Sequence, residues 1–262
     1  MGYHRRMKRA IVINLIPTYN EKDNITKMLI NLVRIASKDK KHRHLILVVD
    51  DNSPDGTGKI VKRLQKMHKI IHLMTGEKKG LGAAMIRGLK HSLHKLKADI
   101  IIPNEADFAF DPAYIPYMIS KIDSGYDVVI ASRHVGDGKT EGWTINRRLN
   151  HWVANKFFAT WVAGVREVQD HNGAFRAIRV KGILDRIDLD SIHITGFGFF
   201  SYILFRLTLL TNKIHEFPVT YKFRTAGESK VSFNPKYIKT YSRDVIEYIN
   251  LSIKIRLEKL TR

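Results

Sequence analysis

Short apolar runs rich in β-branched residues alternate with amphipathic segments through the first half of the chain. The runs predict buried strands, and apolar residues that recur every three or four positions predict helices. Strands are expected at Ala10–Ile16, Leu45–Val49, Ile70–Met74, Ile100–Pro103 and Val128–Ala131, with a helix after each of the first four. This alternation predicts an α/β fold with a central, mostly parallel sheet and helices on both of its faces.

The alternation weakens after Arg133, where longer helices and loops follow. Gly136–Gly142 is expected to be a glycine-rich loop, and Ile214–Phe223 alternates like an edge strand. Helices are expected at the aromatic Arg147–Val165, at the apolar Phe197–Leu210, and at the basic, amphipathic Tyr237–Leu260, where Val245, Ile249 and Ile253 share one stripe. Phe197–Leu210 is too short for the roughly 20 apolar residues of a membrane-spanning helix.

The composition narrows the class of protein. The chain has 262 residues, 44% hydrophobic and 27% charged, which is ordinary for a globular protein with a sizeable core. It has no cysteine, which excludes disulfides, thiolate metal sites and thiol nucleophiles. The basic stretch Met1–Arg9 is not followed by the apolar segment of a signal peptide. We therefore expect a cytoplasmic protein, either soluble or peripheral on the cytoplasmic face of a membrane.

The chain is strongly basic, with 45 Lys and Arg residues against 25 Asp and Glu, a net charge of +20. Such a charge attracts polyanions, which include nucleic acids, anionic lipid headgroups and phosphorylated ligands. The sequence has no zinc-finger spacing and no RRM aromatic motif, so we expect an anionic membrane surface and no nucleic acid as partner. A nucleic-acid-binding protein is the alternative, and it predicts salt-sensitive binding to random duplex.

Two carboxylates follow the predicted central strand Ile100–Pro103. Glu105 and Asp107 lie one residue apart, so both side chains point to the same side of an extended backbone. Ligands of open α/β sheets bind beyond the carboxyl ends of the strands, where carboxylates can hold Mg²⁺ and, through it, a substrate phosphate. The alternative is a strand that simply ends in solvated acids.

Other polar motifs also stand where a predicted strand ends, so they should converge on one cleft. They are Pro17-Thr18-Tyr19-Asn20-Glu21, Asp50-Asp51-Asn52-Ser53-Pro54-Asp55-Gly56-Thr57, Gly80-Leu81-Gly82 and Ser132-Arg133. Asp50 and Asp51 have an alternative role in an Asx turn that caps the next helix. Gly80 and Gly82 serve either a tight turn or the close approach of a phosphate or sugar.

These motifs, together with Glu105-Ala106-Asp107, Phe175-Arg176 and Gly227-Glu228-Ser229-Lys230, occur in the order seen in one enzyme family. Between about Ile11 and Lys230 the chain resembles dolichol-phosphate mannose synthases and related polyprenyl-phosphate glycosyltransferases. The resemblance implies a GT-A type nucleotide-sugar-binding fold. It also implies inverting transfer of a hexosyl group, mannose from GDP-mannose, to a polyprenyl (dolichyl) phosphate with Mg²⁺ or Mn²⁺.

The resemblance also assigns roles to residues. The expected donor-binding residues are Pro17, Tyr19, Glu21, Val49, Asp51, Glu105, Ala106, Asp107 and Arg133, with Glu105 and Asp107 as metal ligands. Arg147, His151, Arg224 and Lys230 are expected to bind the acceptor or its phosphate, and Asp107, Arg133 and Arg147 to be catalytic. The implied boundaries are a glycosyltransferase domain at 1–230, with donor-binding part about 10–133 and acceptor-binding part about 134–230, and a basic amphipathic helix at 231–262.

The sequence departs from the family pattern near the predicted metal pair and the acceptor site. Glu105 replaces an aspartate, Ala109 and Phe110 replace polar residues, and His151 stands where a serine is common. A family motif Thr-Ser-Gly-Phe-Arg reads Asn172-Gly173-Ala174-Phe175-Arg176. A catalytically degenerate nucleotide-sugar-binding protein is therefore an alternative, and it predicts nucleotide binding without turnover.

The choice of acceptor turns on Asp170. A phosphomonoester has a second pKa near 6, so at neutral pH it is already an anion and needs no catalytic base. Transfer to a hydroxyl usually needs such a base, and Asp170 lies where related enzymes keep one. We interpret Asp170 as a residue that orients Arg176 or its loop. A hydroxyl-directed glycosyltransferase is the alternative, and it predicts dependence on Asp170 as base.

The aromatic helix leaves two interpretations open. Trp152 and Trp161 are expected in the core, but the neighbouring Arg147-Arg148 favours a membrane-interface position, because basic and aromatic residues together suit the headgroup boundary. His151 on the same helix is either a structural residue or a ligand of the acceptor phosphate.

Overall fold

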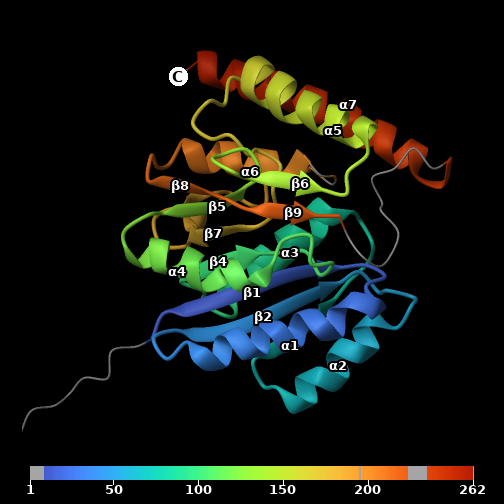
Figure 1. Ribbon diagram of the computed structural model, residues 1–262, viewed down its shortest axis with the longest axis vertical. Coiled ribbons are helices and arrows are strands. Elements are labelled where there is room, and N and C mark those ends of the chain that lie inside the picture. Colours follow the sequence, from blue (N-terminus) through green and yellow to red (C-terminus); the bar gives the residue numbers. More distant parts are fainter. Residues whose placement is uncertain (1–8, 195, 197, 224–234, 262) are drawn as a thin grey trace, which may run out of the picture.

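The apolar runs form the centre of a seven-stranded sheet with strand order β3-β2-β1-β4-β7-β5-β8 (Figure 1). Its strands are β1 (Ile11–Thr18), β2 (Arg43–Asp50), β3 (Ile71–Thr75), β4 (Ile100–Pro103), β5 (Val128–Ser132), β7 (Arg176–Arg179) and β8 (Ile214–Pro218). The computed structural model describes residues 9–194, 196, 198–223 and 235–261 of the chain. All five strands predicted in the first half are confirmed.

Most neighbouring strands of the sheet run parallel, as the alternating pattern predicts. The exception is β7, which is antiparallel to both β4 and β5 and pairs Ile178 with Ile101 and Ala177 with Val129. The sequence analysis did not identify β7 as a strand, because its four residues are too few to show a period. The sheet is therefore mixed, and an antiparallel strand separates two parallel groups.

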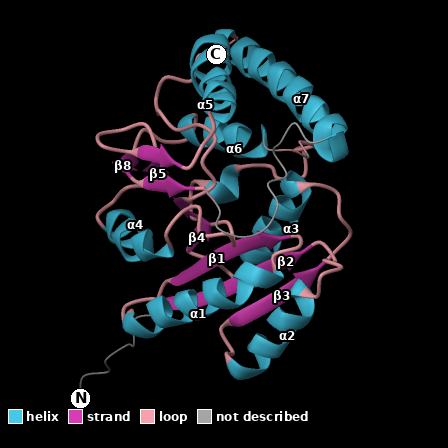
Figure 2. Cartoon of the chain, turned by 45° about the vertical axis from the view of Figure 1, so that its right-hand side comes forward, coloured by secondary structure: helices cyan, strands magenta, loops and turns pink. Residues whose placement is uncertain are grey.

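Helices cover both faces of the sheet, as predicted (Figure 2). They are α1 (Lys22–Lys38), α2 (Thr57–Met67), α3 (Leu81–His94), α4 (Ile115–Asp123) and α6 (Gly198–Thr208), with 3₁₀ turns at Pro112–Tyr114 and Leu184–Arg186. Alternate residues of β1 feed the two cores: Ile13 and Leu15 join the core beneath α3 and α6, and Val12 and Ile16 join that beneath α1, α2 and α4. Helix α3 lies so close to the sheet that a Cβ on Gly88 would stand 2.5 Å from Leu15.

The second half departs from the predicted elements in two places. The expected loop Gly136–Gly142 contains a short strand, β6 (Lys139–Glu141), and the expected edge strand Ile214–Phe223 is two strands. Of these, β8 lies at the edge of the main sheet and β9 (Thr220–Lys222) pairs with β6. Pro218 has no backbone N–H and ends β8, after which the chain turns to a second partner.

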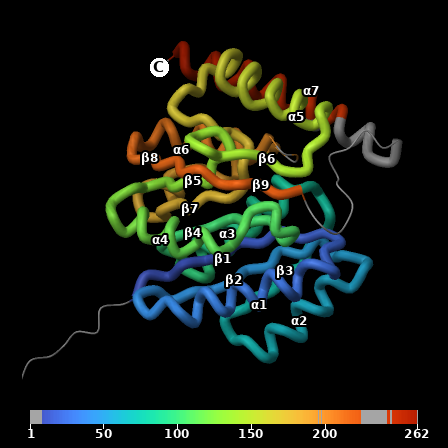
Figure 3. Tube along the Cα trace, viewed as in Figure 1, coloured from blue at the N-terminus to red at the C-terminus, as the bar shows by residue number. Residues whose placement is uncertain are grey.

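Two long helical segments cross one end of the molecule (Figures 1 and 3). Helix α5 (Ile145–Trp152) continues as a π-helix, η2 (Val153–Val162), and packs beside α7 (Pro235–Leu260). The bounds of α7 agree with the prediction, and the stripe singled out in the sequence is not the one that packs into the core. Val245 and Ile253 are exposed, whereas Leu251, Ser252 and Ile255 are buried. Two apolar stripes with the same period run along α7, and periodicity cannot say which one packs inward.

The described helices include none long and apolar enough to cross a membrane. This agrees with the expectation from Phe197–Leu210, which forms the buried helix α6.

An acid–histidine cluster joins α1, β2 and α4 at the amino-terminal edge of the sheet. One oxygen of Asp39 lies 2.8 Å from His42 Nδ1 and 2.9 Å from His44 Nε2, and His42 Nε2 lies 3.3 Å from Asp123. Both histidines are buried. Burial alone would raise the pKa of Asp39, but the hydrogen bonds from His44 and His42 outweigh it and hold that pKa well below its usual range.

We expect Asp39→Asn to lower the free energy of unfolding by about 1–3 kcal/mol near neutral pH, because two buried histidines lose a charged acceptor. The pKa of Asp39 is lower in the folded state, so its contribution is complete above the unfolded value of about 3.9 and is lost as pH falls through the folded value. Urea denaturation at neutral pH and near pH 3 should therefore show a difference that shrinks in acid. Asp137→Asn, on an exposed loop, is the matched control.

Candidate active site

The predicted donor residues gather at the carboxyl ends of β1, β2 and β4. Pro17 stands opposite Val49 and Thr18 opposite Asp50 in the parallel β1–β2 ladder, so Tyr19 and Asp51 leave the sheet together. Asp51 N–H donates to the carbonyl of Thr18 across this edge at 3.1 Å. The predicted convergence of these motifs on one edge of the sheet is confirmed.

The two aspartates after β2 have different partners. Asp50 accepts from Thr18 Oγ1 at 3.0 Å and from the Ser53 N–H and Oγ at 3.0 and 2.6 Å, so it closes the turn, as the Asx-turn interpretation predicts. Asp51 instead forms an ion pair with Arg87 of α3. Only Asp51 therefore presents a charged pair at the strand end.

Tyr19 and Glu21 lie in the loop between β1 and α1. The ammonium of Lys78 stands 3.6 Å from the centre of the Tyr19 ring, which is a cation–π contact between the β1–α1 and β3–α3 loops. Glu21 is buried, its N–H donates to Thr57 Oγ1 at 2.9 Å, and its carboxylate accepts from Asn24 at 2.9 Å. The two loops and the start of α2 are thus held as one unit.

The acid pair Glu105 and Asp107 follows β4 as predicted. Asp107 is buried and accepts from the Ala109 N–H at 3.0 Å, and Glu105 lines the main cavity of the molecule. Phe108, which lies between Asp107 and Ala109, has a positive φ of 59°. This conformation is uncommon for a bulky residue and marks a tight turn. Burial raises the pKa of Tyr221, and the charges of Glu105 and Asp107 raise it further, so both carboxylates direct negative potential at one cavity wall.

Arg133 at the end of β5 is held by Asp170. The guanidinium donates to both Asp170 oxygens, through Nε at 2.8 Å and Nη2 at 2.6 Å, and the Arg133 N–H adds a third bond at 2.9 Å. Asp170 is fully buried. Burial alone would lower the pKa of Arg133 and raise that of Asp170, but their mutual attraction reverses both shifts, so the pair is ionised.

Asp170 pairs with a different arginine from the one expected. Asp170 also accepts from the Gly173 N–H at 3.1 Å, so it does organise the loop, but Arg176 donates to the carbonyls of Phe200 and Gly173 instead. Glu216 of β8 accepts the Asp170 N–H at 3.0 Å and fixes the backbone there. Both carboxylate oxygens of Asp170 are engaged, and none faces the cavity as a base.

Aromatic rings enclose the outer side of Arg133. The rings of Phe110, Trp143 and Tyr221 have their centres 5.7, 5.8 and 5.4 Å from its guanidinium carbon. Arg147 of α5 stacks on the same wall, 5.0 Å from Trp143 and 4.9 Å from Phe223. The sheet pair β6–β9 carries this wall. Sequence analysis missed this aromatic wall because Trp143, Tyr221 and Phe223 lie in separate short segments. The turn residues next to them were the only sign of it in the sequence.

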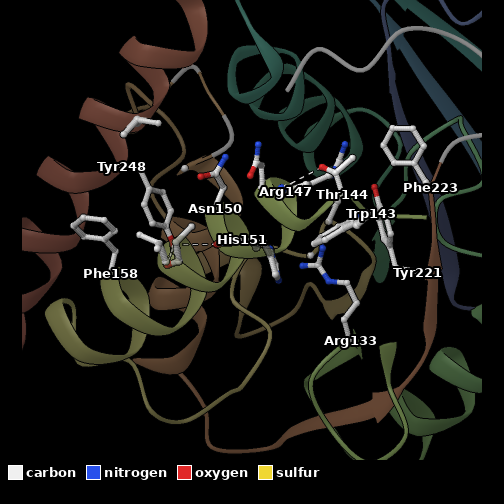
Figure 4. Close-up of a pocket in the computed structure, with 18 of the residues that line it drawn as sticks. Arg133, Trp143, Thr144, Arg147, Asn150, His151, Phe158, Tyr221, Phe223 and Tyr248 are labelled. Carbon is white, nitrogen blue, oxygen red and sulfur yellow. Dashed lines mark hydrogen bonds between the residues drawn. The ribbon is translucent and has the colours of Figure 1, made fainter. Parts of the chain in front are cut away.

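A cavity of about 580 Å³ opens between this wall and the helices α5 and α7 (Figure 4). Arg133 and Tyr221 lie at one end of it, and Phe158 and Tyr248 lie at the other, outer end, while Glu105 and Ile249 also line it. Arg147 and His151 lie between the two ends, as Figure 4 shows. The cavity therefore changes from charged to apolar along its length.

Tyr248 anchors the outer end. Its hydroxyl lies 3.0 Å from Asn172 Oδ1, 3.2 Å from the Ala154 carbonyl and 3.1 Å from Ser201 Oγ, which ties α7 to η2 and α6. Burial raises its pKa to about 12, so it stays a neutral donor. The predicted phosphate-binding residues Arg224 and Lys230, with the motif Gly227-Glu228-Ser229-Lys230, lie outside the described residues.

The structure thus brings an acid pair, an arginine held by a buried carboxylate and the loops that follow β1 and β2 to one edge of the sheet. Residues 15–186 match the family model for glycosyl transferase family 2. The chain belongs to this family and is a glycosyltransferase.

Named relatives place the chain within the family. It is 34% identical over 222 residues to an undecaprenyl-phosphate mannosyltransferase of Micrococcus luteus, covering 84% of this chain and 87% of that protein. It is 31% identical over 230 residues to a polyprenol monophosphomannose synthase of Mycolicibacterium smegmatis, covering 87% and 83%. It is 32% identical over 217 residues to a dolichol-phosphate mannosyltransferase of Pyrococcus furiosus, covering 83% of this chain and 58% of that protein. The resemblance inferred from the motifs is confirmed.

Solved structures confirm the fold. Glucosyl-3-phosphoglycerate synthase of Mycobacterium tuberculosis, in complex with Mn²⁺, UDP and its product, superposes with a TM-score of 0.63 at 17% identity, over 94% of this chain and 80% of that one. The same enzyme with Mg²⁺ and UDP gives a TM-score of 0.61 at 16% identity, over 94% and 80%. At this identity the likeness establishes the predicted GT-A type fold alone.

We expect Asp170→Asn to lower the free energy of unfolding by about 3 kcal/mol or more, because it leaves the buried charge of Arg133 uncompensated. The double variant Arg133→Gln/Asp170→Asn should be more stable than the sum of the single changes predicts, since neither charge remains. Asp190→Asn, which breaks a surface pair with Lys90, should cost less than about 1 kcal/mol. Urea denaturation of the unchanged chain, Arg133→Gln, Asp170→Asn, the double variant and Asp190→Asn measures this, and additive single changes would contradict it.

Proposed function

We propose that this glycosyltransferase moves a hexosyl group, mannose from GDP-mannose, to a polyprenyl (dolichyl) phosphate, with inversion. The observation that carries the proposal is that one cavity has the charged Arg133 at one end and the apolar Phe158 at the other, with Glu105 and Ile249 also in its lining. A lipid phosphate has this sequence of charge and hydrocarbon. The names of the three relatives above, each a mannosyltransferase or synthase acting on a polyprenol or its phosphate, support the same substrates.

In this proposal the donor lies along the carboxyl ends of β1, β2 and β4, within the part of the chain at about 10–133. Pro17, Tyr19, Glu21, Val49 and Asp51 contact the nucleoside, and Ala106 lets the diphosphate approach the backbone beside Glu105 and Asp107. Arg133 contacts the donor phosphates from the opposite side. Its guanidinium is pre-oriented by Asp170, so little side-chain freedom is lost when the phosphate arrives.

Glu105 and Asp107 are suitable ligands for Mg²⁺ or Mn²⁺. Carboxylate oxygens are the ligands of hard cations, and both side chains direct negative potential at the same cavity wall. No three His, Asp or Glu side chains of the described residues form a ready-made metal site, so the donor diphosphate would complete the coordination. When bound, the cation supplies charge neutralisation for the departing diphosphate.

The acceptor end lies within the part of the chain at about 134–230. Arg147 and His151 flank the middle of the cavity, where a phosphate between the donor and the apolar end would lie. Arg224 and Lys230 are proposed to add cationic contacts there. The phosphate is an anion at neutral pH and attacks the sugar without a base. Engagement of Asp170 by Arg133 disfavours the alternative of a hydroxyl acceptor, because that reaction needs a base.

The helices at the outer end fit a membrane surface. Apolar side chains on α5, η2 and α7 face solvent there: Ile145, Leu149, Trp152, Phe157, Trp161, Val245, Ile246, Ile253, Leu257 and Leu260. Trp152 is 48% exposed and Trp161 58%, so the expectation that these two residues lie in the core is wrong. Exposed cations, among them Arg148, Lys254 and Arg256, are interleaved with these residues. We propose that this face lies on the cytoplasmic, anionic surface of a membrane, which delivers the lipid to the cavity.

The proposed reaction predicts transfer of radiolabelled mannose from GDP-mannose to a short polyprenyl phosphate, dependent on Mg²⁺ or Mn²⁺. Other nucleotide sugars and a polyprenol without phosphate should be poor substrates. Asp107→Asn should lower kcat/KM by at least about 100-fold, since loss of metal-phosphate stabilisation removes several kcal/mol. Asp185→Asn, an exposed acid, is the matched control. Nucleotide binding without any transfer would instead support the degenerate binding protein.

The membrane proposal predicts co-sedimentation with vesicles that contain anionic lipid and weaker binding to neutral ones. The double variant Ile253→Ser/Leu257→Ser should bind the anionic vesicles at least about tenfold more weakly, because each apolar side chain contributes more than 1 kcal/mol when buried. Met67→Ser removes an even more exposed apolar residue from the end of α2 and should leave vesicle binding unchanged. Equal binding by the double variant and Met67→Ser would refute this surface.

A further inference from the structure

Two histidines face each other beside the cavity, and one of them, His151, lines it. His134 follows Arg133 after β5, and His151 belongs to α5. Their Nε2 atoms lie 2.8 Å apart, and their ring planes are inclined by only 6°. The ring of Trp143 packs edge-on against His151, with the centres 5.0 Å apart. At this distance one Nε2 must donate a hydrogen bond and the other must accept it.

The surroundings of the pair keep it neutral. Burial lowers the pKa of His151 to about 2, and Arg133, His134 and Arg147 lower it too, against an opposing effect of Asp170. Burial also lowers the pKa of His134, with Arg133 and Lys156 adding to the shift and Asp170 opposing it. The charge of Asp170 is balanced by its ion pair with Arg133, so the remaining influence is cationic.

A neutral pair carries two ring protons on four nitrogens, and one of these protons lies in the Nε2–Nε2 bond. The donating ring has an Nδ1 without a proton. One further proton can bind there and leave the Nε2–Nε2 bond intact, whereas a second would put protons on both Nε2 atoms and break it. The geometry therefore allows the uptake of one proton.

We propose that the His134–His151 pair takes up one proton from solvent when a phosphomonoester dianion enters the cavity, and so binds the acceptor headgroup in a proton-linked way. The inference rests on the proposed function, which brings that dianion between Arg147 and His151. Two negative charges there offset the positive charges of Arg147 and Lys156 and favour the protonated pair. A neutral hydroxyl acceptor would not draw the proton, so the pair favours phosphate over hydroxyl.

Calorimetry of the full chain with farnesyl phosphate tests the proposal. Near pH 7.5 this probe is already dianionic, because its second pKa is near 6, so any proton taken up on binding enters the protein. Titrations in two buffers of different ionisation enthalpy should show uptake of up to one proton. The affinity should fall by up to about tenfold per pH unit between about pH 7 and 8.5. Inorganic phosphate, titrated alongside, shows whether the lipid chain is needed.

Variants of the pair separate the proton link from folding. His151→Ser, which restores the residue common in the family, and His134→Asn should bind farnesyl phosphate without proton uptake and with an affinity independent of pH in this range. His215→Asn, on the surface of β8 against Tyr117, should keep both effects. Thermal unfolding checks that each variant is folded.

Three results would overturn the inference. Binding to the unchanged chain without proton uptake, or uptake that persists in both pair variants, overturns the proton link and leaves the proposed function standing. Failure of the unchanged chain to bind farnesyl phosphate, while GDP still binds, overturns the proposed acceptor and the proton link with it. Equal affinity for inorganic phosphate, with the same uptake, supports the link and assigns the site to a free phosphate.

Discussion

The buried ion pair between Arg133 and Asp170 is the constraint on which the site depends. A guanidinium removed from water is tolerated only where a carboxylate and hydrogen bonds compensate it, and Asp170 supplies both. Asp170 is itself fixed through Glu216 of β8 and the Gly173 N–H. The ion pair therefore positions the edge strand, the loop before β7 and the end of β5. The aromatic wall lies against the outer side of Arg133.

The segments that meet around that pair decide which parts of the cavity are charged and which are apolar. The central sheet contributes carboxylates and arginine at one end, and α5, η2 and α7 contribute aromatic and aliphatic side chains at the other. Hydrogen bonds of Tyr248 hold the two helical segments together at the apolar end. The charged groups thus lie at the end of the sheet, whereas the apolar side chains are carried by helices at the periphery.

The sequence predicted the α/β alternation and the convergence of motifs well, because β-branched runs and strand-end motifs are local signals. It failed where the structure depends on distant partners. Strands β6, β7 and β9 are three or four residues long and exist only through their pairing. The partner of Asp170 and the wall of Trp143 and Tyr221 arise from tertiary contacts that no spacing encodes. On α7 two apolar stripes compete, and their period alone does not tell which one packs inward.

The antiparallel strand β7 has a further consequence. It stands between β4 and β5, whose ends carry the acid pair and Arg133. Neighbouring strands are about 4.8 Å apart, so these two groups start from backbones about 10 Å apart. Main-chain hydrogen bonding sets this gap, and side-chain size does not. Mutation of the core can therefore change the side chains on either side of the gap without altering the distance between the two strands.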